Sequence, residues 1–286
     1  MSWAAHDLEP YAIQKHMRLK VAFVPLLIGS YSPDMMTKWF VYGIHLGPWD
    51  LKASDPAQFH RGWPGFGFTH SLIYGVAIGL IIWKVFGSKL WGVSFIIGQF
   101  AHAITDTGDT VGTMLLFPWT FHFHLDAWAY AGQTGRMTDA AAYFSGLGSM
   151  WDLVFIVYGL YSWRVLTSAY FDNVIYRADA FWPWLNRLVP RGALVVLYRA
   201  AFFYGTSRWI AWTVWAHVIH HYPYDLSWGG PHWVPAAHPW LRTSATEATE
   251  GTAPGRARHT AAGAPTENVR RPPRVPSHCD ASVTMP

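Results

Sequence analysis

The fold is decided by residues 70–106, which read HSLIYGVAIGLIIWKVFGSKLWGVSFIIGQFAHAITD. Two apolar segments, 70–86 and 90–105, are separated only by Gly87-Ser88-Lys89. A connection this short joins antiparallel helices, and each helix rises about 1.5 Å per residue. His70 and His102 are therefore predicted to lie at the same end of the pair, one helix length away from the turn.

The second segment ends with a carboxylate at helical spacing. His102 and Asp106 are four residues apart, so both project from one face of a helix, and Asp109 follows three residues later. Imidazole is the commonest metal ligand in proteins, and carboxylate oxygens complete sites for Zn, Mn or Fe. A single histidine is equally well explained as an interfacial side chain. The joint set, however, predicts a divalent metal ion at this end.

Composition indicates the class of protein. The chain has 286 residues, of which 51% are hydrophobic and 13% charged, and it contains 18 Trp, 17 Phe and 14 Tyr. Trp and Tyr are enriched where membrane helices meet the lipid headgroups. We therefore expect an all-α, polytopic membrane helical bundle in contact with the lipid bilayer, and a soluble aromatic-rich core is the alternative. The basic residues are scattered rather than striped, which disfavours nucleic-acid binding.

About four to five membrane spans are expected. Residues 1–18 are polar to amphipathic and are expected at the surface. The first apolar segment is shorter than the roughly 20 residues that a straight span needs, and Pro25 lies in its middle, so we expect it to be broken, re-entrant or extended at its N-terminal end. Residues 110–130, interrupted by Pro118, are expected to form a re-entrant or interfacial segment. The apolar segments are 19–33, 70–86, 90–105, 150–166 and 193–219.

Two regions differ in their ability to fold. Residues 1–240 are expected to form an integral membrane helical domain. Residues 241–286 form a polar tail rich in Thr, Ala, Pro and Arg. This tail cannot bury enough apolar area to offset the entropy of ordering, so it is predicted to be disordered unless it binds a partner.

The basic residues near the spans predict an orientation. Cytoplasmic loops carry an excess of Lys and Arg, so the side with more of them is assigned to the cytoplasm. The histidine-rich ends then face outward, to the periplasm, in a multi-pass protein of the cell inner membrane. One side holds Lys15, Arg18, Lys20, Lys84, Lys89, Arg164, Arg177, Arg187 and Arg191, and the other holds Lys38, Lys52, Arg61 and Arg136.

Two arginines lie within the last apolar segment. Arg199, near its inner end, is expected to extend its guanidinium to the interface. Arg208 is deeper, and a charge at that depth usually pairs with an acid. Asp152 is the expected partner.

Several short motifs in the first part of the chain occur in a fixed order. His60-Arg61-Gly62 is followed by Thr69-His70-Ser71-Leu72, by His102-x3-Asp106 and by Leu116-Phe117-Pro118. This order resembles a bacterial inner-membrane family of metal-dependent hydrolases. In that family an H-R-G-x-T-H-S-L signature precedes one membrane helix and H-x3-D ends the next. The resemblance covers about residues 13–120.

The resemblance implies a set of site residues. Pro33-Asp34 matches in part the P-D-x-D that closes the family's first helix, and His16 matches an early histidine. The implied activity is hydrolysis of a phosphate or acyl ester at the outer membrane face, with Asp109 as a base or supporting carboxylate and Arg61 contacting an anionic group. The implied ligands of a divalent metal ion (Zn, Mn or Fe) are His60, His70, His102, Asp106, Asp34 and His16.

Two departures from the family pattern, together with the unusual Trp and Phe content, favour a second hypothesis. Met36 replaces the second acid of P-D-x-D, and residues 63–68 separate Gly62 from Thr69, where the family has about one residue. A straight helix from His16 to Asp34 would also hold the two about 27 Å apart. The alternative is a non-catalytic subunit with the same fold, packed against other membrane subunits of a respiratory or photosynthetic complex through its aromatic surface and tail.

Overall fold

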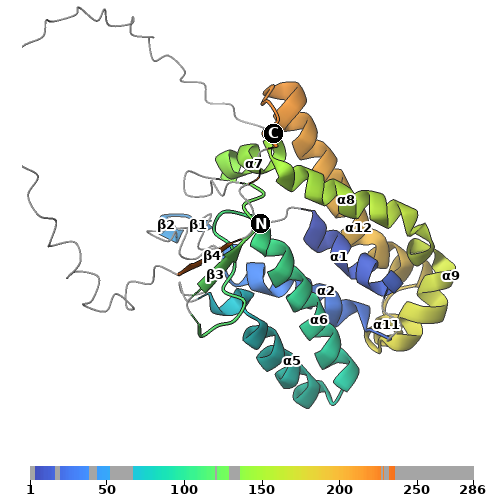
Figure 1. Cartoon of the computed structure of the whole chain (residues 1–286). Helices are drawn as coiled ribbons and strands as arrows, with labels where there is room; N and C mark the ends of the chain where they lie inside the picture. Colours follow the sequence, from blue (N-terminus) through green and yellow to red (C-terminus); the bar gives the residue numbers. More distant parts are fainter. Residues whose placement is uncertain are drawn as a thin grey trace, which may run out of the picture. The chain divides into compact units, whose positions relative to one another are not determined.

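The computed structural model describes residues 4–16, 20–38, 44–51, 67–119, 121–128, 136–226, 228 and 232–235. Within these residues helices predominate, and two small antiparallel strand pairs and connecting loops make up the rest (Figure 1). The predicted all-α class is therefore confirmed. The predicted tail, residues 241–286, lies outside the described residues.

The predicted helix pair is present. Helix α5 (Leu72–Phe86) and helix α6 (Lys89–Thr105) are joined by Gly87, which adopts the left-handed conformation with φ of 64° that only glycine takes without strain. The Ser71 and Ser88 hydroxyls accept the backbone N–H groups of Tyr74 and Trp91, so each helix begins with a side-chain cap. The short turn and the two caps hold α5 and α6 as an antiparallel hairpin.

Helix α2 (Phe23–Met35) packs against α6 at very close range. A Cβ atom added at Gly98 would lie 2.0 Å from the Leu26 carbonyl oxygen, and one added at Gly29 would lie 2.3 Å from the Phe95 carbonyl oxygen. Only glycine at these two positions lets the two backbones approach so closely. The contact brings the C-terminal end of α2 to the end of α6 that carries His102.

The start of α2 is held by side chains from two other elements. Ala22 N–H donates to Ser94 Oγ (2.8 Å), and Val24 N–H donates to Asp179 Oδ2 (2.9 Å). Burial raises the pKa of the Asp179 carboxyl, and the backbone donors offset part of that rise. Pro25 lies in the first turn of the helix, where its missing N–H has no intrahelical acceptor to lose, so it does not interrupt α2.

Helix α1 (Ala5–His16) corrects the expectation that residues 1–18 lie at the surface, because residues 4–11 are buried. Figure 1 shows α1 between α6 and the pair formed by α8 (Leu147–Tyr161) and α12 (Arg191–Thr213). The Asp152 carboxylate on α8 accepts Ala4 N–H (3.0 Å) and Ala5 N–H (2.8 Å). Polar groups of α1 are thus satisfied inside the protein.

The predicted Arg208–Asp152 pair is also corrected. Arg208 Nη2 lies 3.0 Å from Asp7 Oδ2, and Tyr31 donates its hydroxyl to the same carboxylate. The Asp152 carboxylate instead accepts hydrogen bonds from the N-terminus of α1, where the helix dipole favours a negative charge. Two charges from the second half of the chain therefore hold α1 in place.

The remaining helices complete the bundle. Helix α7 (Arg136–Ser145) precedes α8 at an angle of 70°. A π-helix, η6 (Val214–Ile219), continues α12. Between α8 and α12 the chain forms five short helices: η4 (Trp163–Leu166), α9 (Ser168–Tyr170), the π-helix η5 (Phe171–Ile175), α10 (Tyr176–Ala178) and α11 (Phe181–Leu185). Their aromatic side chains pack with α1 and α2 in a core that includes Tyr11, Phe23, Phe171, Trp182, Tyr198 and Phe202.

Residues 110–130 are not helical where the structure describes them. They contain the strand β3 (Phe121–His124), which pairs antiparallel with β4 (His232–Pro235), so that His124 lies opposite His232 in the register. A second pair joins β1 (Ile44–Leu46) and β2 (Trp49–Leu51). The segment that we expected to be re-entrant or interfacial thus consists of turns and the strand β3 where it is described. Its position relative to a bilayer stays a prediction.

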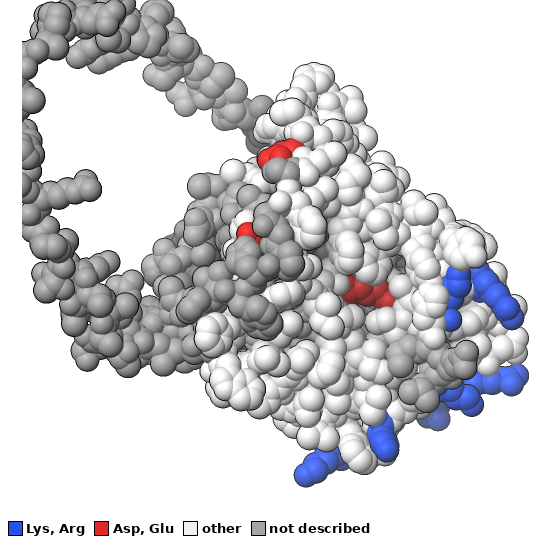
Figure 2. All heavy atoms as spheres, in the orientation of Figure 1, with Lys and Arg blue, Asp and Glu red and all other residues white. Residues whose placement is uncertain are grey.

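The lengths of the helices and their exposed side chains can be compared with what a membrane span requires. Among the described residues no helix is, by itself, both long enough and apolar enough to cross a bilayer, whereas the bent pair α7–α8 meets both conditions together. Large apolar side chains are exposed along α5, α8 and α12. Figure 2 shows the Lys and Arg side chains of one face gathered near the α5–α6 turn, α9 and α11.

Candidate metal centre

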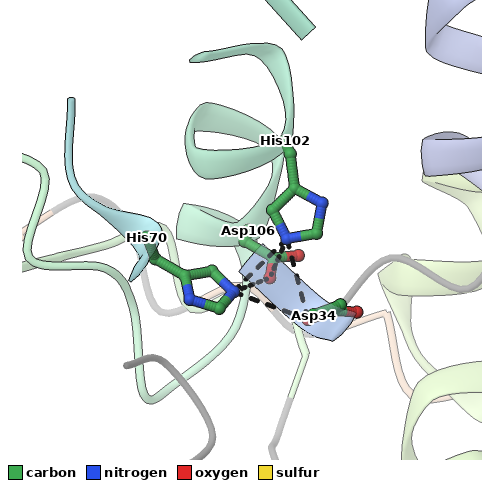
Figure 3. Close-up of side chains that lie close together, drawn as sticks. All are labelled: Asp34, His70, His102 and Asp106. Carbon is green, nitrogen blue, oxygen red and sulfur yellow. Dashed lines mark hydrogen bonds and ion pairs between the residues drawn. The ribbon is translucent and has the colours of Figure 1, made fainter. Parts of the chain in front are cut away.

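Four side chains from three chain segments converge at one end of the α5–α6 hairpin (Figure 3). Asp34 lies in the last turn of α2, and His70 ends the short helix η1 (Phe68–His70) just before α5. His102 is in the last turn of α6, and Asp106 begins the short helix η2 (Asp106–Gly108). The predicted proximity of His70, His102 and Asp106 is confirmed, and Asp34 joins them.

The distances between the ligand atoms fit a tetrahedral metal ion. His70 Nε2 and His102 Nε2 are 3.3 Å apart, and each lies 3.4 Å from Asp106 Oδ2. Asp34 Oδ1 lies 3.5 Å from the first nitrogen and 3.7 Å from the second. Four ligands bound at about 2.0–2.1 Å to a tetrahedral Zn²⁺ lie about 3.3–3.4 Å from one another, because a tetrahedron's edge is about 1.6 times its centre-to-corner distance. Five of the six distances among the four atoms are thus close to the edges of such a tetrahedron, and all four atoms lie within 4.8 Å of one another.

Burial of the group is uneven. The side chains of His70, His102 and Asp106 are 0% exposed, whereas that of Asp34 is 20% exposed. The Lys38 ammonium lies 3.0 Å from Asp34 Oδ1 and is 18% exposed. Buried carboxylates are costly unless a cation or hydrogen-bond donors compensate them, which favours a bound cation at the buried end.

Neighbouring polar groups fix the orientation of His70. The Thr69 hydroxyl lies 3.3 Å from His70 Nδ1, and a metal-ligating histidine characteristically uses its second nitrogen in this way. Gln99 on α6 donates from Nε2 to the Ser71 carbonyl oxygen (2.9 Å), which ties η1 to α6. The His70 Nε2 atom is thus directed toward the centre.

His6 and Glu9 extend the site, and the sequence analysis did not select either of them. His6 Nε2 lies 3.0 Å from Asp106 Oδ1, and its Nδ1 lies 3.3 Å from Glu9 Oε1. The His6 ring also stacks on the His102 ring, with centroids 3.8 Å apart. Ser30 on α2 donates to Glu9 Oε2 (3.2 Å). The one available signal was the i, i+3 spacing of a histidine and a carboxylate before the first apolar segment.

Among the described residues, two other predicted site residues, His16 and Asp109, are not part of this group. His16 is at the C-terminal end of α1, exposed, with its ring 5.1 Å from that of Tyr158, so the structure does not bring it to the centre. Asp109 is buried, and its Oδ1 accepts the N–H groups of Val111 (3.0 Å) and Gly112 (2.8 Å) in the turn after η2. His60 and Arg61 lie outside the described residues.

Met36, at the position where the resemblance implies a second acid, follows α2 as its C-terminal cap and is 48% exposed. The four-residue group is assembled without a carboxylate at this position.

Fold and site together define a helical protein with a buried His₂Asp₂ group that could hold a metal ion. Comparisons with protein-family models, with curated proteins and with solved structures found no match.

Proposed function

We propose that the chain is a membrane-embedded metal-dependent hydrolase that acts on a phosphate or acyl ester at the outer membrane face. The observation that carries the proposal is the spacing of the four ligand atoms, with five interatomic distances of 3.3–3.7 Å. Two imidazoles and two carboxylates suit Zn, Mn or Fe. When bound, such an ion lowers the pKa of a coordinated water and polarises an ester oxygen.

The unequal burial of the ligands supports a catalytic rather than a purely structural centre. Catalytic zinc sites usually have three protein ligands and one open position, whereas structural sites use four. His70, His102 and Asp106 are fully buried and provide the fixed set. Asp34 is partly exposed and already paired with Lys38, so its carboxylate can leave the fourth position to water while keeping an ionic partner.

His6 and Glu9 act on the centre through Asp106. The contact from His6 Nε2 to Asp106 Oδ1 holds the carboxylate with its other oxygen, Oδ2, toward the two ligand histidines. Glu9 in turn holds His6 from its other ring nitrogen. Such outer partners fix the orientation of ligands and contribute to metal affinity.

The exposed apolar surface and the distribution of basic residues support the membrane location. The apolar side chains on α5, α8 and α12 need an apolar solvent or partner to cover them. Lys84 and Lys89 flank the α5–α6 turn, and the metal centre lies at the opposite end of this hairpin, about 22 Å away for the 15 residues of α5. On this proposal the positive-inside rule favours a turn that faces the cytoplasm and a centre on the periplasmic side of the inner membrane.

The proposal is tested with the full chain purified in detergent and loaded with Zn²⁺, Mn²⁺ or Fe²⁺. We expect turnover of an alkyl phosphate ester or an acyl ester that a chelator abolishes and that Asp106→Asn lowers by about a thousandfold, whereas His16→Ala leaves it unchanged. Loaded protein that turns over neither ester class, and that is isolated only within a larger complex, would support the non-catalytic subunit instead.

A further inference from the structure

An apolar cavity of about 470 Å³ lies between the end of α6, β3 and α8. Its volume is within the range of about 300–1,000 Å³ that is usual for ligand sites. None of the described residues that line it is charged. They are Ile104, Thr105, Thr107, Gly108, Phe123, Leu125, Ala127, Trp128, Leu147, Met150, Trp151, Val154 and Trp228.

A second hollow, of about 550 Å³, continues from the first along α8. The two share Met150 and Val154, and the second is otherwise lined by Leu153, Val157, Tyr158 and Tyr161. From Met150 to Tyr161 the helix advances about 16 Å. We call the two hollows together the α8 groove.

The inner end of the α8 groove lies against the turn that carries a metal ligand. Thr105, Thr107 and Gly108 line the first cavity, and they flank Asp106 in the chain. The outer side is open to the apolar surface, because Ile104 and Val154 are 57% and 58% exposed. An apolar chain entering from this surface therefore has its inner end beside the segment that holds Asp106.

We propose that the α8 groove binds the acyl chain of the substrate, which is then a long-chain amphiphile whose ester group reacts at the metal centre. This inference rests on the proposed function for the head group and on the groove for the tail. A helix from another protein fits less well. With side chains it is about 10–12 Å across, so 16 Å of helix occupies roughly 1,250–1,800 Å³, more than twice the volume of either hollow.

The test uses the full chain in detergent and a hexadecyl phosphonate with a photoreactive diazirine in its alkyl chain. The phosphonate resists hydrolysis, so labelling reports binding alone. We expect the label on residues 147–161 and 104–108, competition by unlabelled hexadecyl phosphonate, and at least tenfold weaker competition by hexyl phosphonate. Equal competition by the short chain, or a label spread evenly over α5 and α12, would overturn the inference.

A matched pair of variants examines the junction of the two hollows. Val154 is one of the two residues that line both hollows, and Val154→Trp is expected to lower labelling at least tenfold. The control is Val85→Trp on α5, where the side chain is 69% exposed, and this variant is expected to leave labelling unchanged. Both positions are exposed, so neither substitution disturbs the core. Labelling unchanged in Val154→Trp would contradict the groove.

The two proposals fail separately. A chain that binds no metal but is labelled in the α8 groove would remove the hydrolase proposal and keep a lipid-chain site. Metal-dependent turnover without labelling of the groove would remove only the tail site.

Discussion

His6 Nε2 lies 3.0 Å from Asp106 Oδ1, although 100 residues separate the two in the chain. The contact joins α1, which the second half of the chain holds in place, to the metal-ligand end of α6. The candidate centre therefore depends on both halves of the protein, even though its four ligand residues all lie between residues 34 and 106.

Removing His6 should weaken metal binding without removing a ligand. We expect His6→Ala to lower the affinity for Zn²⁺ by about 10–100-fold, because Asp106 loses the partner that orients it. His16→Ala, on the same helix but away from the centre, is expected to bind as the parent chain does. Competition titration with a chromogenic chelator measures both. Equal affinities in the two variants would contradict the role assigned to His6.

Separating α2 from α6 should weaken both the fold and the centre. Gly98→Ala places a methyl group 2.0 Å from the Leu26 carbonyl oxygen, and overpacking of this kind typically costs about 1–3 kcal/mol. Because Asp34 moves with α2, metal affinity should fall as well. Gly192→Ala, with nothing within 4 Å of the added carbon, is the control and should not destabilise the protein. Denaturant unfolding and metal titration report the two effects, and a fully stable Gly98→Ala variant would argue against the close contact.

The buried ion pair between Asp7 on α1 and Arg208 should contribute more to the free energy of unfolding than an exposed pair does. Arg208→Met leaves the fully buried Asp7 carboxylate without its cation, and we expect a loss of about 3 kcal/mol in the free energy of unfolding. Arg191→Met breaks a pair with Asp172 in which both side chains are more than a third exposed, so the loss should be about 1 kcal/mol or less. Similar losses from the two substitutions would mean that α1 is not held through Asp7.

Lys38 should oppose metal binding. Its ammonium lies 3.0 Å from Asp34 Oδ1, the oxygen that faces the centre, so it competes with a cation for the same carboxylate. We expect Lys38→Met to raise metal affinity by about tenfold through the loss of this repulsion. Lys89→Met, at the other end of the hairpin, serves as the control. A fall in affinity in Lys38→Met, measured by the same titration, would reverse this assignment.

The sequence predicted the central hairpin because its signals are local. Two apolar segments with a three-residue turn admit one arrangement, and the i, i+4 spacing of His102 and Asp106 places both on one helix face. Asp34 was reached through the family resemblance rather than through spacing. Its approach to the histidines depends on Gly29 and Gly98, whose pairing across two helices leaves no periodic signal.

The position of α1 was not predictable in the same way. Its polar side chains resemble those of a surface helix, and they are buried only because Asp152, Arg208 and Asp106 compensate them from distant segments. For the same reason the resemblance led to His16 as the early histidine, and His6 was not considered as a site residue. His16 is the residue nearer to the family motifs in the sequence, and the structure leaves it exposed.

The most direct test of the account is the metal content of the purified full-length chain and of its His70→Ala/His102→Ala variant, measured by inductively coupled plasma mass spectrometry. The account predicts one transition-metal ion per parent chain and none in the folded double variant. A parent chain that remains metal-free after incubation with Zn²⁺, Mn²⁺ or Fe²⁺ would contradict it, as would a double variant that keeps its ion.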